Sequence, residues 1–277
     1  MLRRTSGSSL CYRCGRLNRV DADRCFYCGA PRPGLWGWGH LLGRLGADVD
    51  IARVVIAVAV IAYVASLGLD PAGLFRSRGL FNLLSPSQSA LVALGMTGSL
   101  PWAAGYWWTL LTATYLHGSL LHILFNLLWV RQLGPAVEEF YGRPRTFLIF
   151  TAAGVAGFAL SNALGIAFTV GASGAVFGLL GAMVHFGRSR GGAYGVAILR
   201  QYWQWALVLF VLGFLMSGVN NAAHAGGFLG GYLAAAALGH EATRPERPWH
   251  TLAAIAVAAF TLMAFGLALW TAFGVRI

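Results

Sequence analysis

Residues 171–187 read GASGAVFGLLGAMVHFG and contain no Asp, Glu, Lys or Arg. An uncharged run of this length predicts a membrane helix, because a spanning helix needs about 20 mostly apolar residues. Six other stretches are mostly apolar over a similar length. Together they predict seven spanning helices, at 51–69, 111–131, 147–164, 171–187, 202–217, 222–239 and 251–273. The sequence therefore predicts an all-α polytopic membrane protein.

The composition of the whole chain agrees with this prediction. Of its 277 residues, 57% are hydrophobic and only 10% are charged, whereas about 25% of the residues of a soluble domain are charged. The 37 glycines also fit membrane helices, which tolerate glycine, and they show no three-residue period of the collagen kind. The composition excludes an ordinary soluble enzyme.

The basic residues are all arginine, and their positions predict the orientation of the chain. With a cytosolic N-terminus, 17 of the 20 arginines lie inside, and only Arg76, Arg78 and Arg276 lie outside. Basic residues concentrate on the cytoplasmic side of membrane proteins. We therefore expect an external C-terminus, and the net charge of +11 reflects topology and not nucleic-acid binding. An arginine-only basic set with abundant Ala and Gly indicates a GC-rich bacterial gene, and hence the bacterial inner (plasma) membrane.

Acidic residues are absent from the stretch between Glu139 and Glu241. This absence excludes the paired aspartates of an intramembrane aspartyl protease and a His-Glu-x-x-His zinc helix. It also argues against a proton-coupled carrier, which relies on buried carboxylates.

The polar residues that remain fall near the outer ends of three predicted helices. His122 and Asn126 lie on the second helix, Ser173 begins the fourth, and His224 lies near the start of the sixth. These helices all run from outside to inside, so their early turns share one depth. Because polar groups inside a membrane are costly, their common depth predicts a single functional site.

Ser173 and His224 are the residues expected to carry chemistry. Small neighbours leave the Ser173 hydroxyl accessible, and the N-terminus of its helix offers N–H groups for a developing oxyanion. His224 is a candidate general base for the serine proton. Each residue also has a structural interpretation, because a serine beside glycine packs membrane helices and a histidine at a helix end caps it.

Two glycine pairs connect these helices. Gly174 and Gly178 repeat at four residues on the fourth helix, and Gly227 and Gly231 do so on the sixth. Such small faces permit close backbone approach, which would bring the serine and the histidine within hydrogen-bonding range. The glycines themselves are expected only to pack.

His122 and Asn126 are spaced i and i+4, on one face of the second helix. Both side chains can donate hydrogen bonds to a tetrahedral oxyanion, although such a pair also commonly bonds to neighbouring backbone. His117, which precedes Gly118, is expected to be structural and to tie the loop to the helix start.

These residues together resemble the rhomboid intramembrane serine proteases. The pattern His-x4-His-x3-Asn occupies 117–126, Gly-x-Ser-Gly occupies 171–174, and Ala-His-x2-Gly-x3-Gly occupies 223–231. The run Gly-Pro-Ala-Val-Glu at 134–138 is also similar to the family. The resemblance covers about residues 50–240.

The resemblance implies a six-helix core with Ser173 as nucleophile, His224 as base and no acid or catalytic cofactor. It implies an oxyanion hole made by His122, Asn126 and the Ser173 N–H. It also implies that Phe177 packs against the His224 ring, and that four glycines support the site: Gly171, Gly174, Gly227 and Gly231.

The remaining segments are placed by the same resemblance. The core occupies 51–240, and 241–277 holds a linker and a seventh transmembrane helix, which gives the six-plus-one form. Thr109 stands where the family usually has arginine, which leaves open the contacts of the first loop with lipid headgroups.

The N-terminal segment carries the pattern Cys11-x2-Cys14-x10-Cys25-x2-Cys28. Four thiolates at this spacing predict a tetrahedral structural zinc site, with disulfides as the alternative. The segment resembles a small zinc ribbon or, through Asn18, a RanBP2-type finger, and we favour the ribbon. We therefore expect a cytosolic zinc module at 1–30, which recruits an unknown protein partner or only caps the N-terminus, and a linker at 31–50.

The sequence thus predicts a serine endopeptidase that cleaves transmembrane proteins near the outer membrane face through an acyl-enzyme. The alternative is a non-catalytic rhomboid-like adaptor that binds membrane proteins or takes part in their quality control. A transporter is a third alternative, for which the sequence offers no charged pathway.

Overall fold

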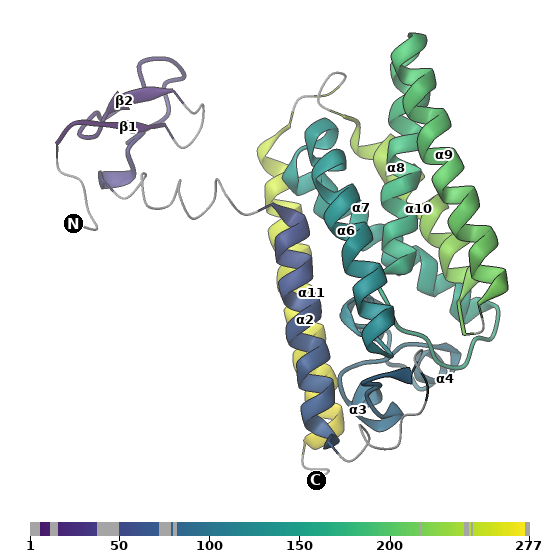
Figure 1. The fold of residues 1–277 in the computed structure, drawn as a ribbon. Helices are drawn as coiled ribbons and strands as arrows, with labels where there is room; N and C mark the ends of the chain where they lie inside the picture. Colours follow the sequence, from purple (N-terminus) through teal and green to yellow (C-terminus); the bar gives the residue numbers. More distant parts are fainter. Residues whose placement is uncertain are drawn as a thin grey trace. The chain divides into compact units, whose positions relative to one another are not determined.

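A computed structural model describes residues 6–11, 16–37, 50–71, 79, 82–216, 218–240, 244 and 246–274 of the chain (Figure 1). The chain divides into two compact units, Met1–Asp50 and Ile51–Ile277. Each unit is described by itself.

The first unit contains a small antiparallel sheet. Strand β1 (Ser8–Leu10) pairs with β2 (Leu17–Arg19), and a short 3-10 helix, η1, follows at Leu35–Gly37. Its buried apolar cluster is formed by Cys11, Cys25 and Ala30, with Cys28 packed against it. Because so small a core supplies little hydrophobic stabilisation, a unit of this kind usually needs a metal or a covalent crosslink.

The second unit is built from helices, and its described part contains seven helices of 18 residues or more (Figure 1). They are α2 (Ile51–Leu69), α6 (Leu120–Tyr141), α7 (Arg143–Ala163), α8 (Ser173–Arg190), α9 (Gly192–Leu215), α10 (Asn221–Leu238) and α11 (Pro248–Phe273). The predicted all-α architecture is confirmed. By length and composition, five of the seven are apolar enough to cross a membrane, namely α2, α6, α7, α9 and α11.

Helix α8 differs from those five because it is packed inside the bundle. Helix α10 packs most extensively on α8 and then on α7. Every residue of α8 from Gly174 to Val184 is buried. Other helices therefore separate α8 from lipid, so it can be composed of small residues instead of a strongly apolar surface. Small residues are also what allows helices to approach closely in a membrane.

The second predicted helix begins later than expected. The sequence predicted a span over 111–131, whereas α6 starts at Leu120 and continues to Tyr141. The reason is Ser119, whose side chain accepts a hydrogen bond from the His122 N–H (3.3 Å) and caps the helix. Apolar residues before this cap belong to separate short helices and cannot be distinguished from α6 by hydropathy.

The described residues between α2 and α6 form four short helices at one end of the bundle (Figure 1). They are α3 (Gln88–Ala93), α4 (Ser99–Ala103), α5 (Thr109–Thr112) and the 3-10 helix η4 (Ala113–Tyr115). The C-terminal helix α11 packs on α7, α3 and α5. The Phe265 ring of α11 lies 6.2 Å from the Tyr115 ring, so α11 supports the segment that leads into α6.

Candidate active site

The two catalytic candidates stand at the starts of two helices whose backbones touch. Ser173 is the first residue of α8, and His224 lies in the first turn of α10. A Cβ atom added at Gly227 would overlap the Gly174 backbone, and one at Gly174 would lie 3.2 Å from the Ala223 carbonyl oxygen. The neighbours of the serine and of the histidine are therefore in direct contact.

The His224 ring is stacked on the ring of Phe177. The ring centroids lie 4.3 Å apart and the planes differ by 16°. Phe177 follows Ser173 by four residues, so both lie on the same face of α8. His224, only 5% exposed, is thus held over the first turn of α8, on the face that carries the serine.

Asn221 is a site residue that the sequence analysis did not single out. Its side-chain Oδ1 lies 3.2 Å from Nδ1 of His224. The two residues are spaced i and i+3 on the first turn of α10, which places them on one helix face. That spacing alone did not identify Asn221, because an asparagine at a helix start is more often a cap, as the adjacent Asn220 is.

His122 lies in the first turn of α6 and faces the segment before Ser173. The Gly118 backbone N–H donates a hydrogen bond to Nδ1 of His122 (3.2 Å). Gly171 adopts a φ of +125°, and a Cβ atom there would lie 2.6 Å from Nε2 of His122. Glycine is required at 171 both for this backbone conformation and for the space that the imidazole occupies.

The two other predicted polar residues lie beside His122. Asn126 is 6% exposed, and its Nδ2 donates to the His122 carbonyl oxygen (2.8 Å), which uses one of its two N–H groups. His117 is fully buried, and its ring meets that of His122 edge-on at 5.1 Å.

Thr109, which stands where an arginine was expected, is buried. Its hydroxyl donates to the Tyr106 carbonyl oxygen (2.6 Å) and contacts Oγ1 of Thr97 (3.0 Å). At this position the loop forms internal hydrogen bonds in place of an exposed cation.

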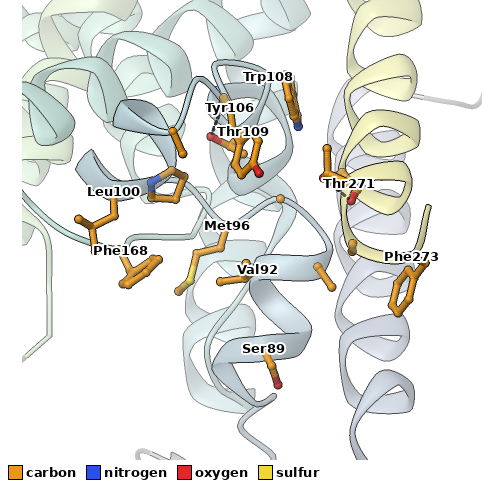
Figure 2. Close-up of a pocket in the computed structure, with 16 residues that line it drawn as sticks. Ser89, Val92, Met96, Leu100, Tyr106, Trp108, Thr109, Phe168, Thr271 and Phe273 are labelled. Atoms are coloured by element: carbon orange, nitrogen blue, oxygen red, sulfur yellow. Dashed lines mark hydrogen bonds between the residues drawn. The ribbon is translucent and has the colours of Figure 1, made fainter. Parts of the chain in front are cut away.

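A cavity of about 470 Å³ lies between α3, the following loop and the end of α11 (Figure 2). Val92, Met96, Phe168 and Phe273 are among its lining residues, and neither Ser173 nor His224 lines it. The cavity is therefore separate from the candidate active site.

The cysteines of the first unit gather as a metal site requires. The Sγ atoms of Cys11, Cys25 and Cys28 all lie within 4.8 Å of one another, and those of Cys11 and Cys28 are 3.8 Å apart. Sulfur atoms held at about 2.3 Å from a tetrahedral zinc ion are separated by about 3.8 Å, whereas a disulfide requires about 2.05 Å. Cys14, the fourth predicted ligand, lies outside the described residues.

Asn18 connects this cluster to the sheet. Its Nδ2 lies 3.3 Å from Sγ of Cys25, and its Oδ1 accepts a hydrogen bond from the Phe26 N–H (3.0 Å). A donor to a thiolate is the kind of outer contact that orients a metal ligand. Three nearby cysteines with such support are able to bind a metal ion.

Comparison with known proteins identifies the family. The model of the Rhomboid domain matches residues 104–241. The protein YdcA of Bacillus subtilis is 31% identical over 138 residues, which is 47% of this chain and 67% of YdcA. The chain belongs to the rhomboid family. The resemblance inferred from the motifs is thereby confirmed.

Two longer rhomboid relatives show how far the similarity extends. Rhomboid protease GluP of Bacillus subtilis is 38% identical over 159 residues, which is 56% of this chain and 31% of GluP. RHOMBOID-like protein 7 of Arabidopsis thaliana is 34% identical over 206 residues, or 67% of this chain and 63% of that protein. The chain thus spans about a third of GluP and less than two thirds of the plant protein.

Proposed function

We propose that this rhomboid is an intramembrane serine endopeptidase that cleaves transmembrane proteins near the outer face of the membrane. The observation that carries this proposal is the position of the His224 ring, stacked on Phe177 one turn beyond Ser173. A general base must lie near the hydroxyl that it activates, and this packing holds the imidazole on that face of α8.

The reaction follows from the chemistry of these side chains. The Ser173 Oγ attacks the scissile carbonyl carbon while His224 takes the hydroxyl proton. The resulting oxyanion is stabilised by the His122 and Asn126 side chains and by the Ser173 N–H, since the first N–H groups of a helix have no acceptor within it.

Collapse of this intermediate breaks the peptide bond. His224 gives its proton to the leaving amine, and the acyl group stays on Ser173. Water then attacks the ester, again with His224 as base, and releases the carboxylate product and the free serine. No step needs a carboxylate, in agreement with the absence of acidic residues between Glu139 and Glu241.

Cleavage of a fluorogenic single-span substrate in liposomes tests this proposal. We expect Ser173→Ala and His224→Ala each to abolish cleavage and to prevent labelling of the protein by a fluorophosphonate. Ser89→Ala, which alters a serine of α3, is the matched control and should cleave normally. Cleavage that persists in both site variants would overturn the proposal. Substrate binding without any cleavage by the wild type would favour the adaptor function.

We propose that the first unit holds a structural zinc ion through Cys11, Cys14, Cys25 and Cys28. The sulfur separation of 3.8 Å supports this assignment, because it matches the edge of a tetrahedral site. The ion would supply the crosslink that this small unit needs and would take no part in catalysis. The same proposal includes an unidentified protein partner that binds this module.

The arginine distribution supports the proposed orientation in a bacterial inner membrane, with the N-terminus in the cytoplasm and the C-terminus outside. A cysteine-accessibility measurement on intact cells would test it, with single cysteines placed at Arg188 and Trp102. The second position should be the one modified by an impermeant reagent.

A further inference from the structure

We propose that Asn221 and the Gly118 N–H hold His224 and His122 in opposite neutral tautomers, so that one imidazole accepts a proton and the other donates a hydrogen bond. This inference rests on the proposed function and deepens it, because it assigns positioning roles to two residues that do not themselves react. It is carried by two hydrogen bonds, one to each ring.

The first hydrogen bond fixes the tautomer of His224. The carboxamide oxygen of Asn221 has lone pairs and no hydrogen, so it only accepts hydrogen bonds. Because this oxygen lies 3.2 Å from Nδ1 of His224, we assign the ring proton to Nδ1, which then acts as the donor. A neutral imidazole has one N–H group, and Nε2 of His224 is therefore the basic nitrogen.

The Asn221 side chain is itself confined. A Cβ atom added at Gly213 of α9 would overlap Oδ1 of Asn221, so the carboxamide lies directly against the α9 backbone. On the other side, the His224 ring is held by the stacked Phe177 ring. The pair Asn221–His224 thus sits between Phe177 of α8 and Gly213 of α9, and these contacts restrict the rotation of the ring and the carboxamide.

The second hydrogen bond fixes the opposite tautomer at His122. A backbone N–H only donates, so Nδ1 of His122 is the acceptor of the Gly118 N–H at 3.2 Å. The ring proton of neutral His122 is therefore on Nε2. This Nε2–H lies beside Gly171, two residues before the nucleophile, where the missing side chain leaves it exposed to the site.

The two assignments match the two tasks that the reaction requires. A base must present a lone pair to Ser173, and an oxyanion hole must present an N–H group. Serine proteases with a triad orient the base with a buried aspartate. Here a neutral carboxamide performs the orientation, which avoids placing a charge at membrane depth, where charges are costly.

Steady-state kinetics of the full-length protein in liposomes test the role of Asn221. We expect Asn221→Leu to lower kcat by about 10- to 100-fold with little change in KM. This loss is smaller than the full contribution of a general base to the rate, which is about 10²- to 10⁴-fold. Asn221→Asp keeps an acceptor and should restore most of kcat. The matched control is Asn220→Ala, which removes the cap of α10 (3.0 Å to the Ala223 N–H) without touching His224.

The outcomes separate a positioning role from a structural one. Asn220→Ala should lower the melting temperature at least as much as Asn221→Leu while retaining kcat. The inference is overturned if Asn221→Leu keeps kcat within twofold, if Asn221→Asp fails to rescue it, or if Asn220→Ala loses as much. If Ser173→Ala cleaves like the wild type, the proposed function itself fails. That result differs from the three outcomes that would overturn only the role of Asn221.

Position 118 offers a test of the second hydrogen bond. Gly118→Ala keeps the N–H group, and the nearest atom to its new Cβ is 3.8 Å away, so it should retain more of kcat than a variant that lacks the donor. Gly118→Pro removes the donor, and we expect a fall in kcat of about 10-fold or more, together with weaker binding of an aldehyde transition-state analogue. Equal kcat in both variants would overturn this half of the inference. A Gly118→Pro protein that melts like the wild type shows that the loss is not due to unfolding.

Discussion

Helices α10 and α11 are both apolar, and both contain glycine, but they are attached to the bundle in different ways. In α10, Gly227 and Gly231 lie against the α8 backbone so closely that no Cβ atom fits. In α11, Gly266 has open space around it, and the helix is held through side chains such as Phe265. The candidate site is therefore positioned by contact between helix backbones. Helix α11 instead supports the bundle through side-chain contacts, which a substitution can change.

The largest expected effect comes from forcing α10 away from α8. Gly231→Val would drive its side chain into the Gly178 backbone, so we expect cleavage to fall by at least 100-fold and stability to fall by about 1–3 kcal/mol or more. The same change in α11, Gly266→Val, places its Cβ atom more than 4 Å from the neighbouring atoms and should leave both properties near wild type. Thermal unfolding in detergent and the liposome cleavage assay measure the two quantities. Similar losses in both variants would break the comparison.

A second, smaller effect is expected from the ring that holds His224. Phe177→Leu removes the stacked contact, which is worth about 0.5–1.5 kcal/mol, and leaves the imidazole less confined. We expect kcat to fall by about 10-fold, with KM nearly constant. Phe260→Leu is the control, because Phe260 lies on α11 and is 54% exposed. A rise in KM with an unchanged kcat would contradict the role given to Phe177.

The contact between α11 and the short helices allows a finer test. Ala268 is 2% exposed, and a Cβ atom added at Gly95 would lie 3.2 Å from the Cβ atom of Ala268. We expect Ala268→Leu to cost about 1–3 kcal/mol by overpacking while cleavage falls only two- to threefold. Ala259→Leu changes an exposed position of the same helix and should do neither. Loss of all activity in Ala268→Leu would show that α11 controls the site as directly as α10 does.

The smallest effect on cleavage is expected from the first unit, which is a separate body in the chain. Cys25→Ser should abolish the binding of one zinc ion per chain, measured by elemental analysis of the purified protein. Basal cleavage of a model substrate should stay within twofold of wild type, because the candidate site residues named above all lie in the second unit. Zinc that remains bound in the Cys25→Ser protein would show that Cys25 is not a ligand.

Most of the helical architecture was predictable because hydropathy and the bilayer thickness together determine it. The start of α6 was not, since Leu111, Ala113 and Leu116 continue the apolar pattern before the cap at Ser119. The catalytic candidates were accessible through their spacing and their common depth. Asn221 was not, because its role depends on which face of α10 meets Phe177, and hydropathy does not specify that rotation.

The donor that orients His122 belongs to the main chain, and this has a genetic consequence. A replacement at position 221 alters the atom that orients His224, whereas a replacement at position 118 leaves the N–H group in place unless it introduces proline. A saturation-mutagenesis screen for cleavage should therefore find codon 221 intolerant of most residues and codon 118 tolerant of small ones. Only proline at position 118 would reveal the His122 half of the tautomer control in such a screen, because proline is the one encoded amino acid that lacks a backbone N–H group.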